Sequence, residues 1–412
     1  MTGRALRISV AAVALSLGVS GCSMMPSFLG GGVEKPKPAD LGPNVALIAV
    51  RQAWTNHVGP VTDPMTINVS GSTLTVSGSD GTVAAIDAVS GRDLWRASVG
   101  GPIAAGAGSD GTVAAIDAAS GRDLWRASVG GPIAAGAGSD GTVAAVVTRA
   151  NELVALSRGK QLWRQKLTAV AYTPPFVAGG RVFVQTADRA VSAFDGRTGH
   201  KLWTQQRPGE PLVLHHAGVM LAVGNTLVVG LSGRLAGLDP LTGAIRWEAP
   251  IATPRGINDV ERLVDLVAPV SRVGDSICAR AFQAAVGCAD TSRGTVQWTK
   301  PANGAEGLSG DGSFVFGTEA DGKVMAWQRA DGERAWESDR LRYRTLTAPL
   351  ALGRSVVIGD DTGLVHMLSR TDGSPLNRLT PDGSAIMAAP VVAGNTLVVL
   401  TRTGGVFGYV PE

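Results

Sequence analysis

The chain has 412 residues, and its 37 Lys and Arg residues against 34 Asp and Glu leave a formal net charge of only +3. This near balance gives no reason to expect a nucleic acid as partner. The length suits one large domain or two ordinary ones. Gly is frequent, with 55 residues, and the Val- and Leu-rich runs between the glycines predict many short strands joined by tight turns.

Residues 1–21 have the character of a signal peptide. Arg4 and Arg7 make a positive start, and the apolar run 8–19 is too short to span a bilayer. The run ends in VSGC at 19–22, which resembles the lipobox of bacterial lipoproteins. That resemblance implies cleavage before Cys22, acylation of Cys22 and, with serine following, transfer to the outer membrane, with the protein on its periplasmic face. The alternative is a plain secretory signal with a chance cysteine.

The stretch 22–43 is rich in Gly and Pro and is expected to be a flexible tether behind the lipidated residue. No later run approaches eighteen apolar residues, so we expect no membrane-spanning helix there. Residues 44–412 are therefore expected to form the folded domain.

One pattern recurs along this domain: an alternating strand, Asp, two residues, Ser or Thr, Gly, three residues, and Trp. It is clearest in 83–95, 191–203 and 235–247. Weaker forms stand at 153–163, 286–298 and 324–336, and in 364–377 the Trp position is taken by Asn377.

Each position of the pattern has a physical role. Strand alternation buries one face, and the Asp carboxylate can accept backbone N–H groups of the turn that follows. Gly supplies the positive φ that the turn needs. The Trp opens the next strand and packs a large apolar side chain between neighbouring sheets.

Spacing of the repeat predicts the fold. Outside one anomaly, the intervals between marks are about 38 to 51 residues, the length of a four-stranded propeller blade. Trp54 lacks three preceding strands, and 389–412 supplies three strands without a Trp strand. We therefore predict an all-β, eight-bladed β-propeller of four-stranded antiparallel blades, in which N- and C-terminal strands share one blade. The structural tryptophans are Trp54, Trp95, Trp125, Trp163, Trp203, Trp247, Trp298 and Trp336.

The anomaly is a tandem duplication. Residues 78–107 and 108–137 differ only at Val89 and Ala119, and a third GSDGTVAA begins at Gly138. Thirty residues are too few for a blade. We expect one copy to fit the ring and the other to be an irregular insertion; a ninth blade is the alternative.

Two cysteines remain besides Cys22. Folding 278–288 as a hairpin about Gln283 places Cys278 opposite Cys288, close enough for a disulfide. Two buried free thiols are the alternative. A metal site is not expected, because no His cluster accompanies them.

The repeat resembles that of the pyrroloquinoline-quinone propellers. Together with the lipobox, the C-terminal closure and the segments 208–216, 257–270 and 342–350, it resembles the non-enzymatic BamB family of outer-membrane lipoproteins. That resemblance implies a scaffold that docks on the periplasmic POTRA domains of the barrel-assembly protein, beside accessory lipoproteins, and assists insertion of β-barrels. It implies no cofactor, and unfolded outer-membrane proteins as further partners.

The same resemblance implies a docking site at Leu212, Leu214, His215 and Asp265. His215 replaces the family's Arg, so a permanent charge becomes conditional. Val267 replaces a second acidic residue, which leaves the leucines as the main anchors. These segments lie in the two longest Trp intervals, where extra length forms loops that tend to bind. The alternative is that Leu212 and Leu214 face inward and that Asp265 is a solvated loop charge.

Catalysis is not expected. The chain lacks the adjacent cysteine pair of the quinone-dependent dehydrogenases that share the repeat, and its five histidines are scattered. It contains no GxSxG elbow and no P-loop. A quinone-dependent periplasmic dehydrogenase and a ligand-binding periplasmic propeller are the two alternatives, although the latter lacks an aromatic cluster.

Overall fold

A computed structural model describes residues 36–61, 67–70, 72–77, 82–98, 103–104, 107–108, 112–116, 123–130, 133–207, 213–214, 217–255, 257–258 and 262–412. Pro38–Glu412 form one compact unit, and Met1–Lys37 are assigned to another. The described residues form strands and turns without a helix. Among them, accordingly, no helix has the length and apolar character needed to cross a membrane. The predicted signal peptide and Cys22 lie outside the described residues.

Four-stranded antiparallel sheets make up most of the unit of residues 38–412. In chain order, the first three comprise β2 (Asn68–Ser70), β3 (Thr73–Ser77), β4 (Thr82–Asp87) and β5 (Asp93–Ser98); β10 (Ile133–Ser139), β11 (Ala144–Thr148), β12 (Glu152–Ser157) and β13 (Lys160–Lys166); and β14 (Phe176–Ala178), β15 (Arg181–Gln185), β16 (Ala190–Asp195) and β17 (Lys201–Gln206).

The next four sheets follow without interruption. They comprise β18 (Met220–Val223), β19 (Thr226–Leu231), β20 (Arg234–Leu238) and β21 (Ile245–Pro250); β22 (Leu266–Val273), β23 (Ser276–Ala281), β24 (Ala285–Asp290) and β25 (Thr295–Pro301); β26 (Ser309–Gly310), β27 (Phe314–Thr318), β28 (Val324–Gln328) and β29 (Arg334–Ser338); and β30 (Leu350–Leu352), β31 (Ser355–Gly359), β32 (Val365–Ser369) and β33 (Pro375–Leu379).

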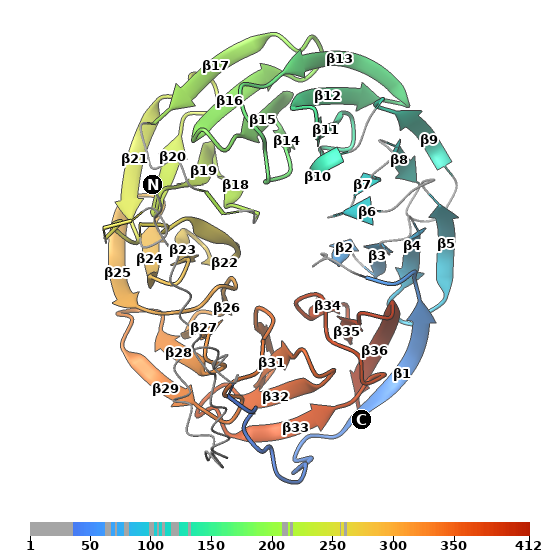
Figure 1. The fold of residues 1–412 in the computed structure, drawn as a ribbon, viewed down its shortest axis with the longest axis vertical. Coiled ribbons are helices and arrows are strands. Elements are labelled where there is room, and N and C mark those ends of the chain that lie inside the picture. The colour runs from blue at the N-terminus through green and yellow to red at the C-terminus, as the bar shows by residue number, and fades with distance from the viewer. Residues whose placement is uncertain are drawn as a thin grey trace, which may run out of the picture. The chain divides into compact units, whose positions relative to one another are not determined.

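Within this unit the sheets stand one after another in chain order, each with its first strand innermost and its fourth strand outermost (Figure 1). Buried apolar side chains fill the space between consecutive sheets: Val182 and Phe194 of one sheet, for example, share a cluster with Leu153 and Trp163 of the sheet before. This radial packing of separate sheets is the arrangement of a β-propeller. The predicted all-β class is confirmed.

A further four-stranded sheet joins the two ends of the described chain. Its order is β1 (Val50–His57), β36 (Gly405–Pro411), β35 (Thr396–Leu400) and β34 (Val391–Ala393), and Trp54 of β1 pairs with Gly408 of β36. One face of this sheet packs on Leu74 of the β2–β5 sheet, and the other packs on Met367 of the β30–β33 sheet. We call it the terminal sheet.

Tryptophan and glycine make the junctions between sheets. At six junctions of the described residues, a Cβ atom placed on the turn glycine of one sheet would lie 2.1 to 2.5 Å from the tryptophan side chain of the sheet before. These glycines have φ between +68° and +74°, where other residues are strained. The pairs are Trp54 with Gly91, Trp163 with Gly199, Trp203 with Gly243, Trp247 with Gly294, Trp298 with Gly332 and Trp336 with Gly373.

Hydrogen bonds complete each junction. The indole N–H of Trp54 donates to the carbonyl of Ala88 at 2.9 Å, and that of Trp298 donates to the carbonyl of Arg329 at 2.7 Å. The repeat Asp holds the turn itself: Asp195 accepts the backbone N–H and the hydroxyl of Thr198, both at 2.8 Å. The Asp, Gly and Trp of the motif therefore act together, with the Trp reaching across to the next sheet.

Asn377 replaces tryptophan where the next sheet has no such turn. The terminal sheet has the chain ends in that place, so no glycine turn is present for an indole to cover. Instead, the Asn377 amide donates to the carbonyl of Ile48 at 2.8 Å. Its cross-strand neighbour is Met367, whereas Ala193, Ala155 and Ala326 face the tryptophans of other sheets. A larger neighbour thus accompanies the smaller side chain.

The duplicated segments have different pairings. Strands β4 and β5 of the first copy belong to a four-stranded sheet, whereas β8 (Thr112–Ile116) and β9 (Asp123–Ser128) of the second copy pair only with each other among the described strands. A second two-stranded sheet, β6 (Ile103–Ala104) with β7 (Ala107–Gly108), lies between them in sequence and beside β10. Trp95 and Trp125 lie on β5 and β9, and their side chains are outside the description.

Strands β23 and β24 form the hairpin expected about Gln283, which has φ of +47°. Cys278 and Cys288 face each other in its register and are joined by a disulfide. Both are fully buried.

Replacing Gly199 by Ala should lower the free energy of unfolding by about 3 kcal/mol, through backbone strain at φ +72° and overlap with the Trp163 ring. Gly180 is the matched control, because it has φ +70° and no atom within 4 Å of an added Cβ. Gly180→Ala should cost only about 1 kcal/mol. Urea unfolding measures both, and equal losses would contradict the role assigned to the indole.

Candidate functional site

Three connections meet where the sequence places the docking residues. They are 186–189 between β15 and β16, 207–219 between β17 and β18, and 251–265 between β21 and β22. The second-to-third-strand loop and the connection to the next sheet leave an antiparallel sheet at the same end of its strands. All three connections therefore belong to one loop face.

Asp265 joins these connections by hydrogen bonds. Its Oδ1 accepts a hydrogen bond from Arg189 Nη1 at 2.7 Å, and its Oδ2 accepts one from the backbone N–H of Leu214 at 3.1 Å. The two charged side chains are only 8% and 18% exposed. Removing one partner of such a shielded pair leaves the other charge uncompensated, so breaking the pair is costly.

The pocket beside this pair has a volume of only about 50 Å³ and is lined by Tyr172, Gln185, Leu214 and Asp265, among others. Sites for small ligands typically have roughly 300–1,000 Å³. The cavity beside this pair is therefore too small for a cofactor.

The structure brings two of the predicted site residues together, Leu214 and Asp265. Leu212 and His215 lie outside the described residues. Val267, at the position where the family has an acidic residue, is buried on β22 and bridges to Gly218. Arg189 was missed by sequence analysis, because a turn arginine carries no signal of a partner 76 residues away.

Ile257 is a second feature of the loop face that sequence analysis did not single out. It belongs to the connection 251–265, and 99% of its surface is exposed. A single exposed apolar side chain is common on protein surfaces and does not by itself mark a binding site.

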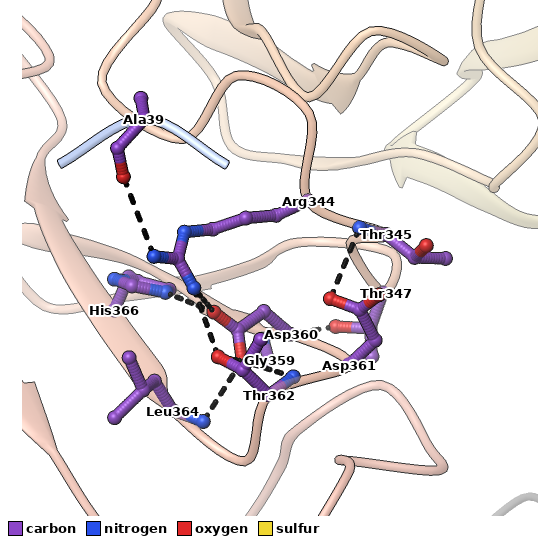
Figure 2. A network of polar contacts seen from close by, with 10 residues as sticks. All are labelled: Ala39, Arg344, Thr345, Thr347, Gly359, Asp360, Asp361, Thr362, Leu364 and His366. Atoms are coloured by element: carbon purple, nitrogen blue, oxygen red, sulfur yellow. Dashed lines mark hydrogen bonds and ion pairs between the residues drawn. The ribbon is translucent and has the colours of Figure 1, made fainter. Parts of the chain in front are cut away.

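A second polar network lies farther along the same face, at the segment 342–350 that carried part of the family resemblance. Figure 2 shows the carboxylate of Asp360 at its centre. Arg344 Nη1 and His366 Nε2 both contact Asp360 Oδ2 at 2.9 Å, while the backbone N–H groups of Thr362 and Leu364 donate to Oδ1 at 2.9 Å.

This network also holds the start of the folded unit. Arg344 Nη2 donates to the carbonyl of Ala39 at 3.4 Å, and the N–H of Ala39 donates to the carbonyl of Arg342 at 3.0 Å. Ala39 therefore lies against the loop face, and Figure 2 shows it above Arg344.

Burial by itself would raise the pKa of Asp360, but hydrogen bonds from His366, the Leu364 N–H and Thr362 outweigh it and lower that pKa to about 2. The carboxylate is thus charged throughout the physiological range. Within the described part of the chain, no group of three or more His, Cys, Asp or Glu side chains is placed to hold a metal ion.

Comparison with known proteins identifies the family. Residues 109–338 match the family model described as Outer membrane protein assembly factor BamB. A relative of that name from Burkholderia pseudomallei is 39% identical over 372 residues, which is 89% of each chain. The chain belongs to the BamB family. Another member, from Bordetella pertussis, is 35% identical over 98% of this chain and 96% of its own.

A solved structure supports the fold of the BamB family for this chain. BamB from Moraxella catarrhalis matches with a TM-score of 0.67 at 22% identity, covering 88% of this chain and 99% of its own. The resemblance seen in the repeat and in the loop segments is confirmed at the level of the family.

Replacing Asp360 by Asn should lower the free energy of unfolding by about 2 kcal/mol at neutral pH, from a pKa of about 2 in the folded state against 3.8 unfolded. Because the folded-state pKa is depressed, this stabilisation is present above about pH 4 and is lost as the pH falls toward 2. Denaturant unfolding of both proteins across that range is the measurement.

Asp331→Asn is the control, since this exposed turn residue accepts one hydrogen bond, from Glu333 N–H. It should cost far less at neutral pH. A difference between wild type and Asp360→Asn that persists undiminished at pH 2 would contradict the role of the charged carboxylate.

Proposed function

We propose that this protein is a non-enzymatic scaffold of outer-membrane protein assembly that docks through its loop face on the periplasmic POTRA domains of the barrel-assembly protein. Leu212, Leu214 and His215 would make the contact, together with Asp265. The observation that carries the proposal is the bond from the Leu214 N–H to Asp265 Oδ2, which fixes Leu214 beside Asp265 before any partner arrives. Preorganisation of this kind reduces the entropic cost of binding.

Within this proposal Asp265 has a positioning role. Its two oxygens are engaged by Arg189 and by Leu214 N–H, so a partner meets a pair that is already neutralised. Apolar side chains then provide the binding energy. The half-buried Leu214 lines the same small cavity as Asp265. His215 would add a charge only when protonated.

The anchor proposed from the sequence fits this geometry. Acylated Cys22 would hold the protein at the periplasmic face of the outer membrane through the predicted tether 22–43, although from Ala39 on this stretch is bonded to the folded unit. The bonds of Ala39 to Arg342 and Arg344 support it, because they start the folded unit on the loop face. The folded unit would then begin on the same face as the proposed docking residues.

The architecture proposed for the domain 44–412 is one closed ring of eight blades, sealed by the terminal sheet. Support comes from the eight four-stranded sheets counted in the described residues and from the pairing of β1 with β36. Strands β8 and β9 of the second duplicated copy, 108–137, would be the insertion, since they form only a two-stranded sheet, while residues 133–137 of that copy belong to β10 of the ring.

Replacing Leu214 by Glu should abolish co-purification with the barrel-assembly protein from detergent-solubilised membranes, because a charge would enter the proposed apolar contact. Replacing Leu212 should act in the same way. Leu241→Glu is the matched control: this leucine is 56% exposed in a turn at the opposite end of the strands. Partners would be identified by mass.

Undiminished recovery of the barrel-assembly protein with Leu214→Glu would refute the docking site. Loss with both glutamate variants would show that the effect is not specific to the loop face. Circular dichroism of each variant establishes that the fold is kept.

Deleting residues 108–137 should leave a folded protein with an unfolding midpoint no lower than that of the full chain, because the deletion joins the first copy directly to Gly138 and all eight four-stranded sheets can still form. Thermal unfolding followed by circular dichroism tests this. A deletion variant that does not fold would instead favour a ninth, required blade.

A further inference from the structure

The junction between the β30–β33 sheet and the terminal sheet differs from the others. It has Asn377 in the tryptophan position and chain ends in place of a glycine turn. A pocket of about 420 Å³ lies at this junction, lined by Ile48, Leu352, Met367, Val392, Leu397 and Tyr409, among others. Its volume is within the range of sites that bind small ligands or single side chains.

The pocket is separate from the candidate docking site. Leu352 ends β30 and Ser355 begins β31, whereas Asp360 follows the end of β31. The pocket and the loop face therefore lie at opposite ends of the strands. A ligand bound in this pocket would contact none of the residues proposed for docking, so a role for the pocket goes beyond the proposed function.

Most of the lining is apolar, and Tyr409, one of the residues that line the pocket, has an unsatisfied hydroxyl. The hydroxyl oxygen of Tyr409 is buried and makes no hydrogen bond among the described residues. Burial, with the charge of Asp382 second, raises the pKa of Tyr409 to about 12, so the group is a neutral hydroxyl at physiological pH. A buried polar group without a partner is costly, and a bound carbonyl or N–H could satisfy it.

Exposed apolar side chains continue the surface next to the pocket. Val45 and Leu47, just before Ile48, are 46% and 66% exposed. The Leu47 N–H donates to the carbonyl of Leu376, so this segment is held along β33. Together, pocket and rim form an apolar patch of the kind that marks binding surfaces.

The repeat itself indicates the chemistry that fits. At the other described junctions an indole occupies the space between consecutive sheets, and at five of these junctions its N–H donates to a carbonyl of the next sheet. Here the chain supplies Asn377, whose amide repeats the hydrogen bond to Ile48 without filling the same volume. The missing component is an aromatic ring.

We propose that this pocket binds an aromatic side chain, tryptophan or tyrosine, presented by an extended peptide of another protein. The ring lies among Met367, Leu397 and Val392, where the aliphatic and thioether groups pack well on aromatic faces. Tyr409 contributes a hydrogen bond to the polar atom of the ring or to the peptide backbone. Leu47 and Val45 contact the residues on either side of the aromatic one.

The test uses the full mature chain labelled with ¹³C at methionine methyl groups, so that Met367 reports from inside the pocket. The probe is a capped pentapeptide of glycine and serine with a central tryptophan, and the matched peptide has alanine there. We expect the Met367 methyl resonance to shift with the tryptophan peptide, with a Kd on the order of 1 mM. The alanine peptide should leave it unchanged.

Val392→Trp fills the pocket from β34 and should remove the shift. Val273→Trp on β22 is the control, since Val273 is 39% exposed and lies on a different sheet. Tyr409→Phe keeps the volume and should weaken binding by about 3- to 10-fold, the loss of one hydrogen bond.

Three results would overturn the proposal: no shift with the tryptophan peptide, an equal shift with the alanine peptide, or unchanged affinity in a folded Val392→Trp protein. If that variant does not fold, Tyr409→Phe decides in its place, and an affinity equal to that of the wild type is then the overturning result.

Discussion

A tryptophan of one sheet covering a glycine of the next is the contact on which this architecture depends. The indole crosses from sheet to sheet, and only a residue without a side chain lets it approach the turn so closely. At the six described junctions of this kind, one sheet is thereby positioned by its neighbour, independently of the loops at the other end of the strands. The terminal sheet shows the same constraint from its exception, because loss of the turn is accompanied by loss of the tryptophan at Asn377.

Because the tryptophan junctions lie at one end of the strands, the loops at the other end can differ in sequence and length without disturbing them. The loop face is held together by shielded ion pairs in place of stacked rings: Arg189 with Asp265, Arg280 with Glu319, and Arg344 with Asp360. Each pair joins loops or strands of different sheets or connections, and each has at least one partner nearly or fully buried. Such pairs give orientation more than stability, since desolvation offsets much of their attraction. A surface ordered in this way suits a scaffold that holds partners in a fixed arrangement.

Membership of the BamB family agrees with this separation between the tryptophan junctions and the loop face. The family match over residues 109–338 includes the repeats from 153–163 to 324–336 and the connections 207–219 and 251–265, which contain the residues proposed for docking. The apolar pocket lies at the terminal sheet, where Asn377 stands in the tryptophan position and bonds to the carbonyl of Ile48. It is separate from the described tryptophan junctions.

The sequence by itself determined the strand repeat, the all-β class, the family and the hairpin about Gln283, because these depend on residues within about ten positions of one another or on a spacing that recurs. Tertiary structure alone decided the rest. Identical GSDGTVAA peptides begin the third strand of one sheet at Thr82 and lead into the second strand of another at Ala144, so local sequence does not choose the position. Likewise Arg189 meets Asp265 across 76 residues of sequence, and Ala39 meets Arg344 across 305. Those contacts exist only because stacked sheets bring their connections to one face, and no local pattern encodes the angle at which neighbouring sheets pack.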